Sequence, residues 1–423
     1  MALLPRFERL TRAKCGFAAA AAALLIGWSA AALPGRADPE APAAAAPDVL
    51  TTKVVYLSKR YPEPPPLSLL EKILTDEGVQ GSRLAINEIN QTGRFLKQHF
   101  ELVEVVAKRD QDVVNLARPL LAEGKGLIVA DLNPGDLLAL SDLPEAKDAV
   151  IFNVRSSRDE LRQEDCRANV FHIMPNWAMR ADALAQYLVW KKWRRWLVVH
   201  GTTPGDMEYL AAIRRAAKKF GGKIVDERVY EFDPGSRRTD TGHQQIQTQL
   251  PLLTQGVPDH DVVFVSDVGE AFGDYLMFRT YEPRPVVGSQ GLQAVAWHRA
   301  YEQYAGTQLQ NRFERLADRI MTERDYAAWL AVRVVGEAVT RTNKNSVEDV
   351  RARILSKEFE VAGFKGIAHT FRAWDHQMRQ PMLISGPRAL VSISPQDGFL
   401  HERFLTDTMG FDAPETKCRF DQQ

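Results

Sequence analysis

Polar side chains follow several apolar runs of this sequence, at the points where predicted strands end. Arg155, Ser156 and Ser157 come directly after one such run, and together they offer a guanidinium fork and two hydroxyl groups. These groups can hold a polar ligand by hydrogen bonding and charge, with no covalent step. An internal ion pair from Arg155 to Asp159 or Glu160 would use the same guanidinium, and the sequence leaves both interpretations open.

Two further candidate ligand-binding residues, Tyr61 and Asn133, follow other predicted strands. Tyr61 stands shortly before three consecutive prolines at 64–66, whose stiff polyproline conformation would present the phenol rigidly. A plain surface turn is the alternative for Tyr61. Asn133 precedes Pro134, which suits the first position of a helix and leaves backbone N–H groups free for a ligand.

Aromatic and amide side chains at two other places are candidates for a contact with a ring-bearing ligand. Asn176 and Trp177 open a predicted helix, and Gln290 begins a segment that ends at Trp297. Aromatic rings at such positions can clamp an apolar or aromatic ligand. Tryptophans that pack beneath a chain connection would give the same pattern, so both interpretations stay open.

Thr202 and Asp267 follow two predicted strands later in the chain. Their hydroxyl and carboxylate groups are candidates for polar ligand contacts. Asp267 would look the same from sequence if it were the N-cap of a helix, since aspartate is among the preferred capping residues. The sequence does not separate these roles.

Signatures of catalysis and of metal binding are missing from the sequence. It contains no G-x-G-x-x-G after a strand, no G-x-x-x-x-G-K-[ST] and no G-x-S-x-G. Its nine histidines show no metal-ligand spacing, and it has no calcium-loop pattern. We therefore expect a protein that is not an enzyme and that has no cofactor and no metal site.

A β-α-β unit near the start of the chain predicts the scaffold that positions these residues. Strand-like runs at 53–57 and 100–106 enclose a predicted helix, with Gly93 expected just beyond the helix end. A helical wheel gathers five residues into one buried stripe and leaves Leu84 outside it; the five are Val79, Ser82, Ala85, Ile86 and Ile89. Such a unit implies a parallel sheet with a right-handed crossover.

Strand and helix signals then alternate along the chain. Short apolar runs predict strands at 126–130, 149–153, 170–174, 196–200, 223–230, 261–266 and 285–288. This alternation is typical of α/β layers with parallel sheets, and the number of strands favours two lobes. Because ligands of such folds bind outside the carboxyl ends of the strands, the candidate residues stand where a ligand is expected.

The N-terminal segment reads as a secretory signal peptide over residues 1–32, followed by a Pro/Ala-rich linker over 33–50. A basic start precedes a charge-free apolar run and small residues for cleavage, and a membrane anchor is the alternative. Removal of this segment takes away four basic residues and one acidic residue, which leaves a net charge of −3. A nearly neutral chain argues against a nucleic-acid partner.

Two cysteines, Cys166 and Cys418, remain after cleavage. In an oxidising compartment they would be expected to pair if their Cα atoms come within reach, and the bridge would fasten the C-terminal tail to the body. Two separate buried thiols are the alternative.

The order of several segments resembles a known family. The segment GSRLAINEIN (81–90), a following glycine and a strand that ends near Asp110 look like the periplasmic substrate-binding components of ABC transporters, of the type I leucine/isoleucine/valine-binding branch. Later segments agree in order: 195–199, 220–225, 261–267, 326–328 and 363–366, leading to Phe371. The resemblance covers residues 53–395. Within the family, YLSKRY (56–61) and FRAWDHQMRQP (371–381) resemble a subgroup associated with PQQ-dependent alcohol dehydrogenase systems.

This resemblance implies an α/β, two-lobed type I periplasmic binding protein fold, with a ligand cleft between lobes joined by hinge crossovers. Lobe one would comprise 53–174 and 291–344, lobe two 175–290 and 345–395, and a C-terminal tail 396–423. A small-molecule ligand and an ABC transporter permease would be the partners of a monomeric protein in the periplasm. A ligand sensor without transport, or an accessory redox protein of the quinone pathway, is the alternative.

The resemblance also raises a doubt about the ligand. Amino-acid-binding relatives typically place a Gly- and Ser-rich loop where this chain has 131–136, DLNPGD. Asp131 and Asp136 would repel an anionic group, so a simple amino acid is not the expected ligand. Asp267 matches the acidic position that relatives often use near a ligand amine.

Overall fold

The computed structural model describes residues 49–62, 73–231 and 240–420. The predicted signal peptide, nearly all of the predicted linker and the three consecutive prolines lie outside the described residues. Leu50, expected as the last linker residue, is already the first residue of a strand. The linker therefore ends slightly earlier than predicted.

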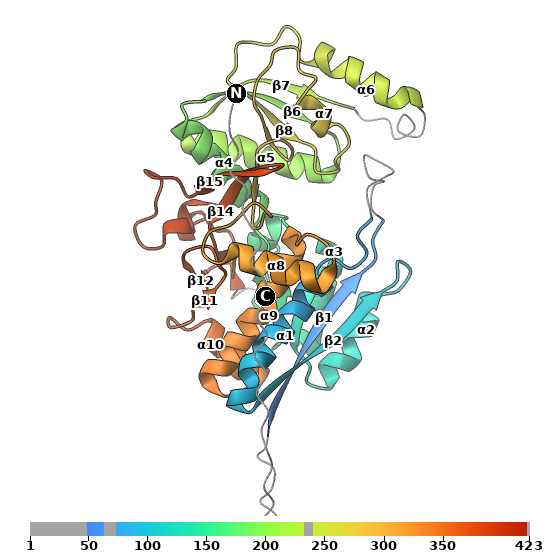
Figure 1. The fold of residues 1–423 in the computed structure, drawn as a ribbon, viewed down its shortest axis with the longest axis vertical. Coiled ribbons are helices and arrows are strands. Elements are labelled where there is room, and N and C mark those ends of the chain that lie inside the picture. Colours follow the sequence, from blue (N-terminus) through green and yellow to red (C-terminus); the bar gives the residue numbers. More distant parts are fainter. Residues whose placement is uncertain (1–48, 63–72, 232–239, 421–423) are drawn as a thin grey trace, which may run out of the picture. The chain divides into compact units, whose positions relative to one another are not determined.

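Within the described ranges, the first sheet has five parallel strands. Their spatial order is β2 (Gln98–Ala107), β1 (Leu50–Lys59), β3 (Leu127–Asp131), β4 (Val150–Asn153) and β5 (Val170–His172). Figure 1 shows β1 and β2 side by side. The predicted β-α-β unit with its parallel strands is confirmed, and all carboxyl ends lie at one edge of the sheet.

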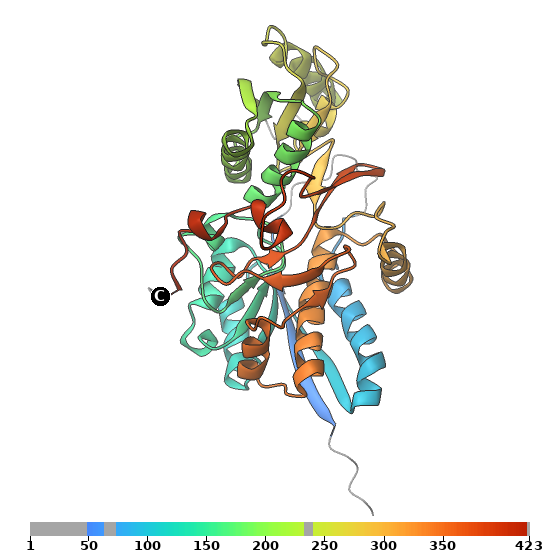
Figure 2. The same ribbon diagram turned by 90° about the vertical axis from the view of Figure 1, so that its left-hand side faces the viewer.

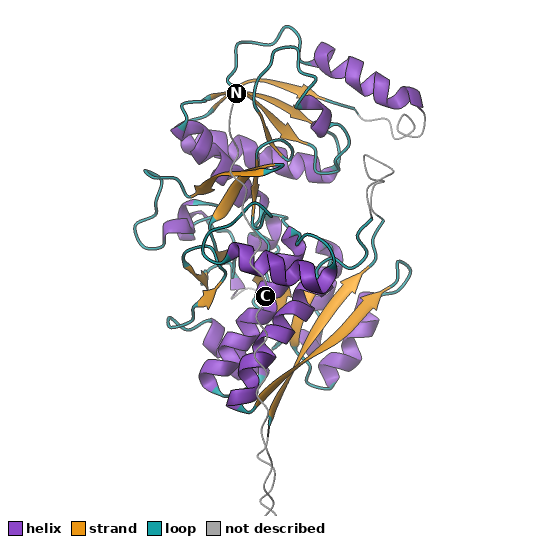
Figure 3. Cartoon of the chain, viewed as in Figure 1, coloured by secondary structure: helices purple, strands orange, loops and turns teal. Residues whose placement is uncertain are grey.

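Helices cover both faces of this sheet. Helices α1 (Val79–Leu96) and α9 (Glu323–Thr342) lie on one face, and α2 (Val113–Ala122) and α3 (Pro134–Ser141) on the other (Figure 1, Figure 3). Side chains alternate along β1 accordingly. Val54 and Tyr56 belong to the core under α1 and α9. Val55 and Leu57 belong to the core under α2 and α3, as the period of a strand requires.

Helix α1 runs further than predicted, because Gly93 lies inside it. A Cβ atom on Gly93 would lie 2.5 Å from the carbonyl oxygen of Gln98, so glycine permits the close approach of β2. The helix ends at Leu96, and its C-cap Lys97 takes a left-handed conformation with φ 55°. The five stripe residues are buried as predicted, and Leu84 is buried too because α9 packs against α1.

The second sheet has four parallel strands among the residues that the structure describes. Their order is β7 (Lys223–Val229), β6 (Arg195–His200), β8 (Val262–Ser266) and β9 (Val286–Gly288). One face carries α4 (Trp177–Trp190) and α5 (Pro204–Phe220), and the other carries α6 (Asp240–Leu253) and α7 (Gly273–Leu276). Trp196 and Val198 point to the first pair of helices, whereas Leu197 and Val199 point to the second. Every predicted strand is present in one of the two sheets.

In the part of the chain that the structure describes, three connections run between the lobes built on these sheets. The first joins β5 to α4, the second joins β9 to α8 (Gly306–Ala317), and the third joins β13 (Met378–Arg379) to β14 (Met382–Gly386). β14 pairs with β10 (Gln293–Val295) and β15 (Ala389–Ser394) in an antiparallel sheet that packs on α4. The expected pair of α/β lobes with hinge crossovers is thus the observed architecture.

Part of the segment expected in lobe two packs instead with lobe one. It comprises α10 (Val347–Ile354), β11 (Val361–Ala362), β12 (Ala368–Phe371) and β13. Val350, Phe359 and Met378 lie in the core that α1 and α9 share. The third crossover therefore comes near residue 380, and the boundary expected at 344 is too early because α10 follows α9 on the same lobe.

Candidate functional site

Three predicted ligand-binding residues meet at the carboxyl edge of the first sheet. Tyr61, Asn133 and Arg155 each stand two residues beyond the end of a strand, of β1, β3 and β4 respectively. The backbone N–H of Asn133 donates to the Tyr61 hydroxyl oxygen over 3.0 Å. Arg155 Nε donates to Asn133 Oδ1 over 3.0 Å, and the guanidinium lies 4.9 Å from the centre of the Tyr61 ring. The parallel register brings together residues that lie far apart in sequence.

The two acids of the 131–136 loop are paired within this cluster. Arg155 Nη1 donates to Asp131 Oδ1 over 3.2 Å, and the Tyr56 hydroxyl donates to Asp131 Oδ2 over 2.8 Å. The Tyr61 hydroxyl donates to Asp136 Oδ2 over 2.6 Å, and Lys59 Nζ lies 3.4 Å from the same carboxylate. The acids are therefore balanced by cations, and the expected repulsion of an anionic ligand is reduced.

The internal partner of Arg155 differs from both acids considered in the sequence. Asp159 or Glu160 was the expected alternative to a ligand, whereas the structure pairs Arg155 with Asp131. Asp131 ends β3 beside β4, so the sheet places it next to a residue 24 positions later. Glu160 pairs with Arg158 instead.

Burial raises the pKa values of two tyrosines at this edge, Tyr56 and Tyr61. Burial, followed by the hydrogen bond to Asp136, raises the pKa of Tyr61 above its usual value. Burial and the nearby Asp131 raise the pKa of Tyr56 in the same direction. Both hydroxyls therefore stay protonated at neutral pH, so Tyr61 is a neutral hydrogen-bonding group.

Ser156 and Ser157 lie in a loop that the buried side chain of Asn153 holds. Asn153 Nδ2 donates to the Ser156 carbonyl over 2.8 Å, and its Oδ1 accepts from the Ser156 N–H over 2.9 Å. The carbonyl of Ser157 accepts from the N–H of Trp177 over 2.9 Å. Both serines are largely buried, and this loop of lobe one rests on the first turn of α4 in lobe two.

Asn176 and Trp177 have clear structural roles at the start of α4. Asn176 is the N-cap, and its Oδ1 accepts from the Met179 N–H over 3.0 Å. The Trp177 ring packs against the Tyr209 ring, with 5.0 Å between the ring centres, and Trp177 remains half-buried. Trp297, at the end of the other aromatic segment, is buried in the core of lobe one, which fits the packing interpretation.

The side chains of Asp267 and Gln290 form hydrogen bonds within lobe two. The Asp267 carboxylate accepts from the N–H groups of Ala271, Phe272 and Gly273 over 2.6–2.9 Å and is 1% exposed. Burial raises its pKa, although the three backbone hydrogen bonds oppose that rise. Gln290 Nε2 donates to the Asp267 carbonyl over 2.8 Å. Asp267 is not the N-cap of α7 (Gly273–Leu276), which is Phe272; its carboxylate instead binds the backbone of the loop that leads into this helix, and its ligand role stays a prediction.

Thr202 differs from these two residues because it is exposed. It stands beyond the carboxyl end of β6, one residue before Thr203, the N-cap of α5. Arg158 of lobe one also reaches α5, with its Nε 3.3 Å from Glu208 Oε1. Of the lobe-two groups that contact the lobe-one loop, Trp177 and Glu208 are partly open to solvent.

A buried polar network at the crossovers was missed by sequence reasoning. Arg162, which is fully buried, donates to the carbonyl of Met174 over 2.7 Å and to Gln377 Oε1 over 2.9 Å. Arg180 donates to the Ala294 carbonyl over 3.1 Å, which joins α4 to the second crossover. The partners lie far apart in sequence, so no local spacing could have indicated them.

Lys365 holds the third crossover. Its Nζ donates to Gln380 Oε1 over 2.7 Å and to the Pro381 carbonyl over 3.2 Å. Gln380 Nε2 in turn donates to the Ile173 carbonyl over 2.7 Å, which links the third crossover to the first. Burial lowers the pKa of Lys365 to about 7, although Glu323 opposes that shift. This network joins the first and third crossovers through buried hydrogen bonds.

Within the described ranges, the His, Cys, Asp and Glu side chains form no group of three that could hold a metal ion. The chemistry at the sheet edge is that of hydrogen bonding, charge and aromatic contact. Such an edge can bind and orient a small molecule.

Comparison with known proteins identifies the family of this chain. A family model described as periplasmic binding protein matches residues 72–386. The chain belongs to the periplasmic binding protein family. No curated protein matches its sequence.

Solved structures share the fold of this periplasmic binding protein at low sequence identity. A branched-chain amino acid ABC transporter ligand-binding protein from Burkholderia xenovorans has a TM-score of 0.64 at 15% identity, over 88% of this chain and 100% of that one. A leucine-, isoleucine-, valine-, threonine- and alanine-binding protein from Brucella ovis, in a closed conformation, has 0.63 at 15%, over 87% and 98%. A solute-binding protein from R. palustris in complex with benzoate has 0.61 at 12%, over 87% and 99%. The two-lobed type I fold is therefore shown.

Proposed function

We propose that this periplasmic binding protein captures a small molecule between its lobes and delivers it to the permease of an ABC transporter. Capture is non-covalent and involves no catalysis. Ligand contacts that exist only when the lobes close would shift the population toward the closed state. The protein would act as a monomer in the periplasm, after cleavage of its leader.

The observation that carries this proposal is the meeting of Tyr61, Asn133 and Arg155 at the carboxyl ends of three parallel strands. Ligands of open α/β sheets bind at this edge. The similar structures support a small organic ligand, since one is a branched-chain amino acid ABC transporter ligand-binding protein and another is a solute-binding protein in complex with benzoate. Ser156, Ser157 and Thr202 would add hydroxyl groups, and Trp177 an aromatic face.

The pairing of charges at this edge favours a ligand that is not a simple amino acid. Asp131 and Asp136 are balanced by Arg155 and Lys59, so lobe one presents a nearly neutral wall. Asp267, the candidate amine acceptor, is engaged by backbone N–H groups. We propose a ligand with a ring or an apolar body and one polar or carboxylate group.

A thermal-shift screen tests the proposal. Mature protein is heated with benzoate, benzyl alcohol, benzaldehyde, short alcohols and aldehydes, acetate and leucine. A true ligand should raise the melting temperature in a concentration-dependent and saturable way, because it binds only the folded state. A panel that leaves the melting temperature unchanged at millimolar concentration would contradict binding of this ligand class.

The finer proposal is that the ligand belongs to PQQ-dependent alcohol oxidation. It rests on the resemblance of residues 56–61 and 371–381 to that subgroup. The expected result is tighter binding of an alcohol, or of its aldehyde or carboxylate product, than of leucine. Preference for leucine would contradict this finer proposal and leave the carrier function in place.

The proposed lobe boundaries follow the crossovers. We propose that lobe one ends at about residue 379 and that lobe two resumes with β14. Across the described ranges, none of the helices is both long enough and apolar enough to cross a membrane. Residues 1–32 are proposed as the cleaved leader, which N-terminal sequencing of the exported protein would test.

A further inference from the structure

The C-terminal segment 396–420 contacts the two lobes in turn. We propose that this segment is a strap that restrains the separation of the lobes, with the Cys166–Cys418 disulfide as its covalent end. The inference rests on the proposed function in one respect, that lobe movement accompanies ligand capture. The restraint itself can be measured without a ligand.

The strap begins on lobe two. The Gln396 N–H donates to Gln186 Oε1 of α4 over 3.1 Å. The Phe399 ring packs against the Phe220 ring at the end of α5, with 5.7 Å between the ring centres. The first residues of the strap are thus attached to both helices on one face of the second sheet.

The strap next contacts lobe one through Asp407. Arg372 Nε and Arg379 Nε each donate to the Asp407 carboxylate over 2.9 Å, and all three side chains are at least nine-tenths buried. The two arginines belong to the β12–β13 hairpin, whose His376 carbonyl accepts from the His172 N–H of β5 over 2.9 Å. Removal of one partner from such a buried cluster is costly, so this contact is a firm anchor.

The strap then returns to lobe two. The Gly410 N–H donates to Asp182 Oδ2 over 2.9 Å, and the Gly410 carbonyl accepts from Arg215 over 2.6 Å. The Glu415 carboxylate pairs with Arg215 at 2.9 Å and with Lys219 at 3.2 Å. Asp182 is fully buried in α4, so its charge is balanced only while Arg215 and Lys219 stay in place.

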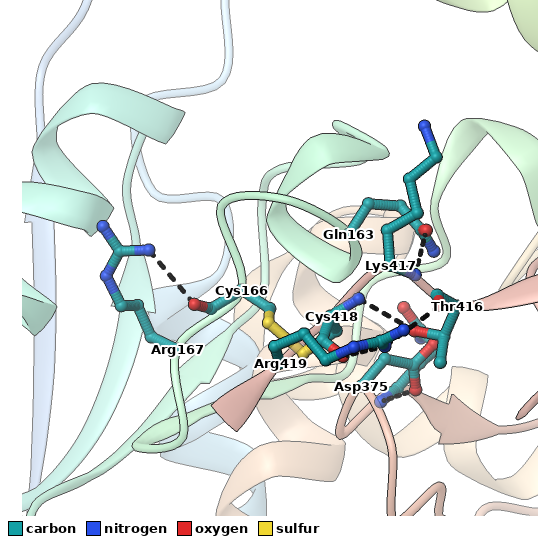
Figure 4. Close-up of a disulfide and its surroundings, with 9 residues drawn as sticks. Gln163, Cys166, Arg167, Asp375, Thr416, Lys417, Cys418 and Arg419 are labelled. Carbon is teal, nitrogen blue, oxygen red and sulfur yellow. Dashed lines mark hydrogen bonds between the residues drawn. A yellow bond between two sulfur atoms is a disulfide. The ribbon is translucent and has the colours of Figure 1, made fainter. Parts of the chain in front are cut away.

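The strap ends on lobe one, where it is fastened covalently. Cys418 is bonded to Cys166, in the loop between β4 and β5 (Figure 4). The N–H of Lys417 donates to Gln163 Oε1 over 2.8 Å, as the dashed line in Figure 4 marks. The Phe420 ring packs against the His376 ring, with 4.4 Å between the ring centres. Figure 2 shows this red segment beside the teal loops of lobe one.

The strap resists separation of the lobes because its contacts alternate between lobe one and lobe two. Hinge motion of two lobes changes the distance between groups on either side of the crossovers. Because the disulfide and Asp407 hold the strap to lobe one, separation of the lobes must break its contacts to Asp182, Arg215 and Lys219. Without the disulfide, the end of the strap could leave lobe one together with lobe two, and separation would be easier.

Hydrogen exchange of the full mature protein without ligand tests this inference. The double variant C166S/C418S removes the covalent end without leaving a free thiol. Exchange at the crossovers, residues 173–176 and 380–382, is expected to rise about tenfold, and small-angle scattering should give a larger radius of gyration. Faster exchange confined to residues 410–420, with unchanged crossovers, would overturn the inference, since the disulfide would then fasten only the tail.

A second variant keeps the inference testable if the double variant does not fold. Glu415→Gln weakens the attachment to lobe two while the disulfide stays, and about threefold faster exchange at the crossovers is expected. Glu337→Gln, in the Arg341–Glu337 pair of α9, is the matched control and should leave the crossovers unchanged. Equal hydrogen exchange at the crossovers in both variants would overturn the inference that this segment restrains the lobes. The thermal-shift screen is independent of this readout, so failure of the carrier function would be recognised separately.

Discussion

Arg155 is the residue on which ligand discrimination at the sheet edge depends most directly. Its guanidinium contacts Asn133, Asp131 and the Tyr61 ring, so it is held at the position where a polar ligand group would arrive. Hydrogen bonds to charged groups are stronger than neutral ones, at about 1.5–3 kcal/mol. A carboxylate should therefore gain more from Arg155 than an alcohol does.

Arg155→Ala should weaken benzoate at least about tenfold more than benzyl alcohol, as measured by titration calorimetry. Arg118→Ala is the matched control, because Arg118 pairs with Glu145 on an exposed surface of the same lobe. Equal losses for acid and alcohol would exclude the assigned role of Arg155 and indicate that it only supports the loop.

His369 should make the stability of the fold depend on pH. It is fully buried in β12, and burial followed by the charge of Lys365 lowers its pKa to about 3. The unfolded chain binds this proton near pH 6.5. Between these two values the unfolded state holds a proton that the folded state lacks, so stability falls as the pH drops from about 6.5 toward 3.

His369→Leu should reduce this dependence. Between pH 7 and pH 5 the variant should lose about 2 kcal/mol less stability than the parent, because each pKa unit corresponds to about 1.4 kcal/mol. Urea unfolding at the two pH values measures the difference. An unchanged slope in His369→Leu would show that other groups cause the acid sensitivity.

At the scale of elements, the contact between α1 and α9 depends on Gly81. A Cβ atom there would lie 1.9 Å from the carbonyl oxygen of Asp325, a backbone atom that cannot turn away. Asp325 is also anchored, because it accepts from the Gly78 N–H over 2.8 Å and pairs with Arg319. The two helices could not approach as they do with any larger residue at 81.

Gly81→Ala should lower the free energy of unfolding by about 1–3 kcal/mol or more, as forced overpacking does. Gly135→Ala is the control, since nothing lies within 4 Å of its added Cβ and alanine favours a helix. Chemical denaturation measures both. Equal stability of the two variants would mean that α1 shifts freely against α9.

At the scale of the whole molecule, the disulfide joins two cysteines that lie 252 positions apart in the sequence. A cross-link over so long a loop should stabilise the fold by about 2–5 kcal/mol, so C166S/C418S should lose that amount in urea unfolding. In mature protein that has not been reduced, neither cysteine should react with a thiol reagent. Two reactive thiols would contradict the pairing.

The local architecture could be predicted from the sequence because it depends on nearby residues. The period of apolar side chains determined the strands and the buried stripe of α1, and the Asn133–Pro134 pair marked the start of α3. The alternation of predicted strands and helices also placed Tyr61, Asn133 and Arg155 at one edge of a sheet, because the carboxyl ends of parallel strands lie together. The end of α1 was misplaced, since a glycine can serve close packing as well as a turn.

The tertiary structure decided every feature that depends on partners far apart in the chain. Asp131 rather than Asp159 or Glu160 balances Arg155, because neighbouring strands place it there. The third crossover falls near residue 380, because α10 and β11–β13 pack on lobe one. Local sequence determined which segments are strands and helices and which residues follow them. The pairing of charges, the path of the crossovers and the course of the C-terminal strap follow from contacts between distant segments, which no local pattern records.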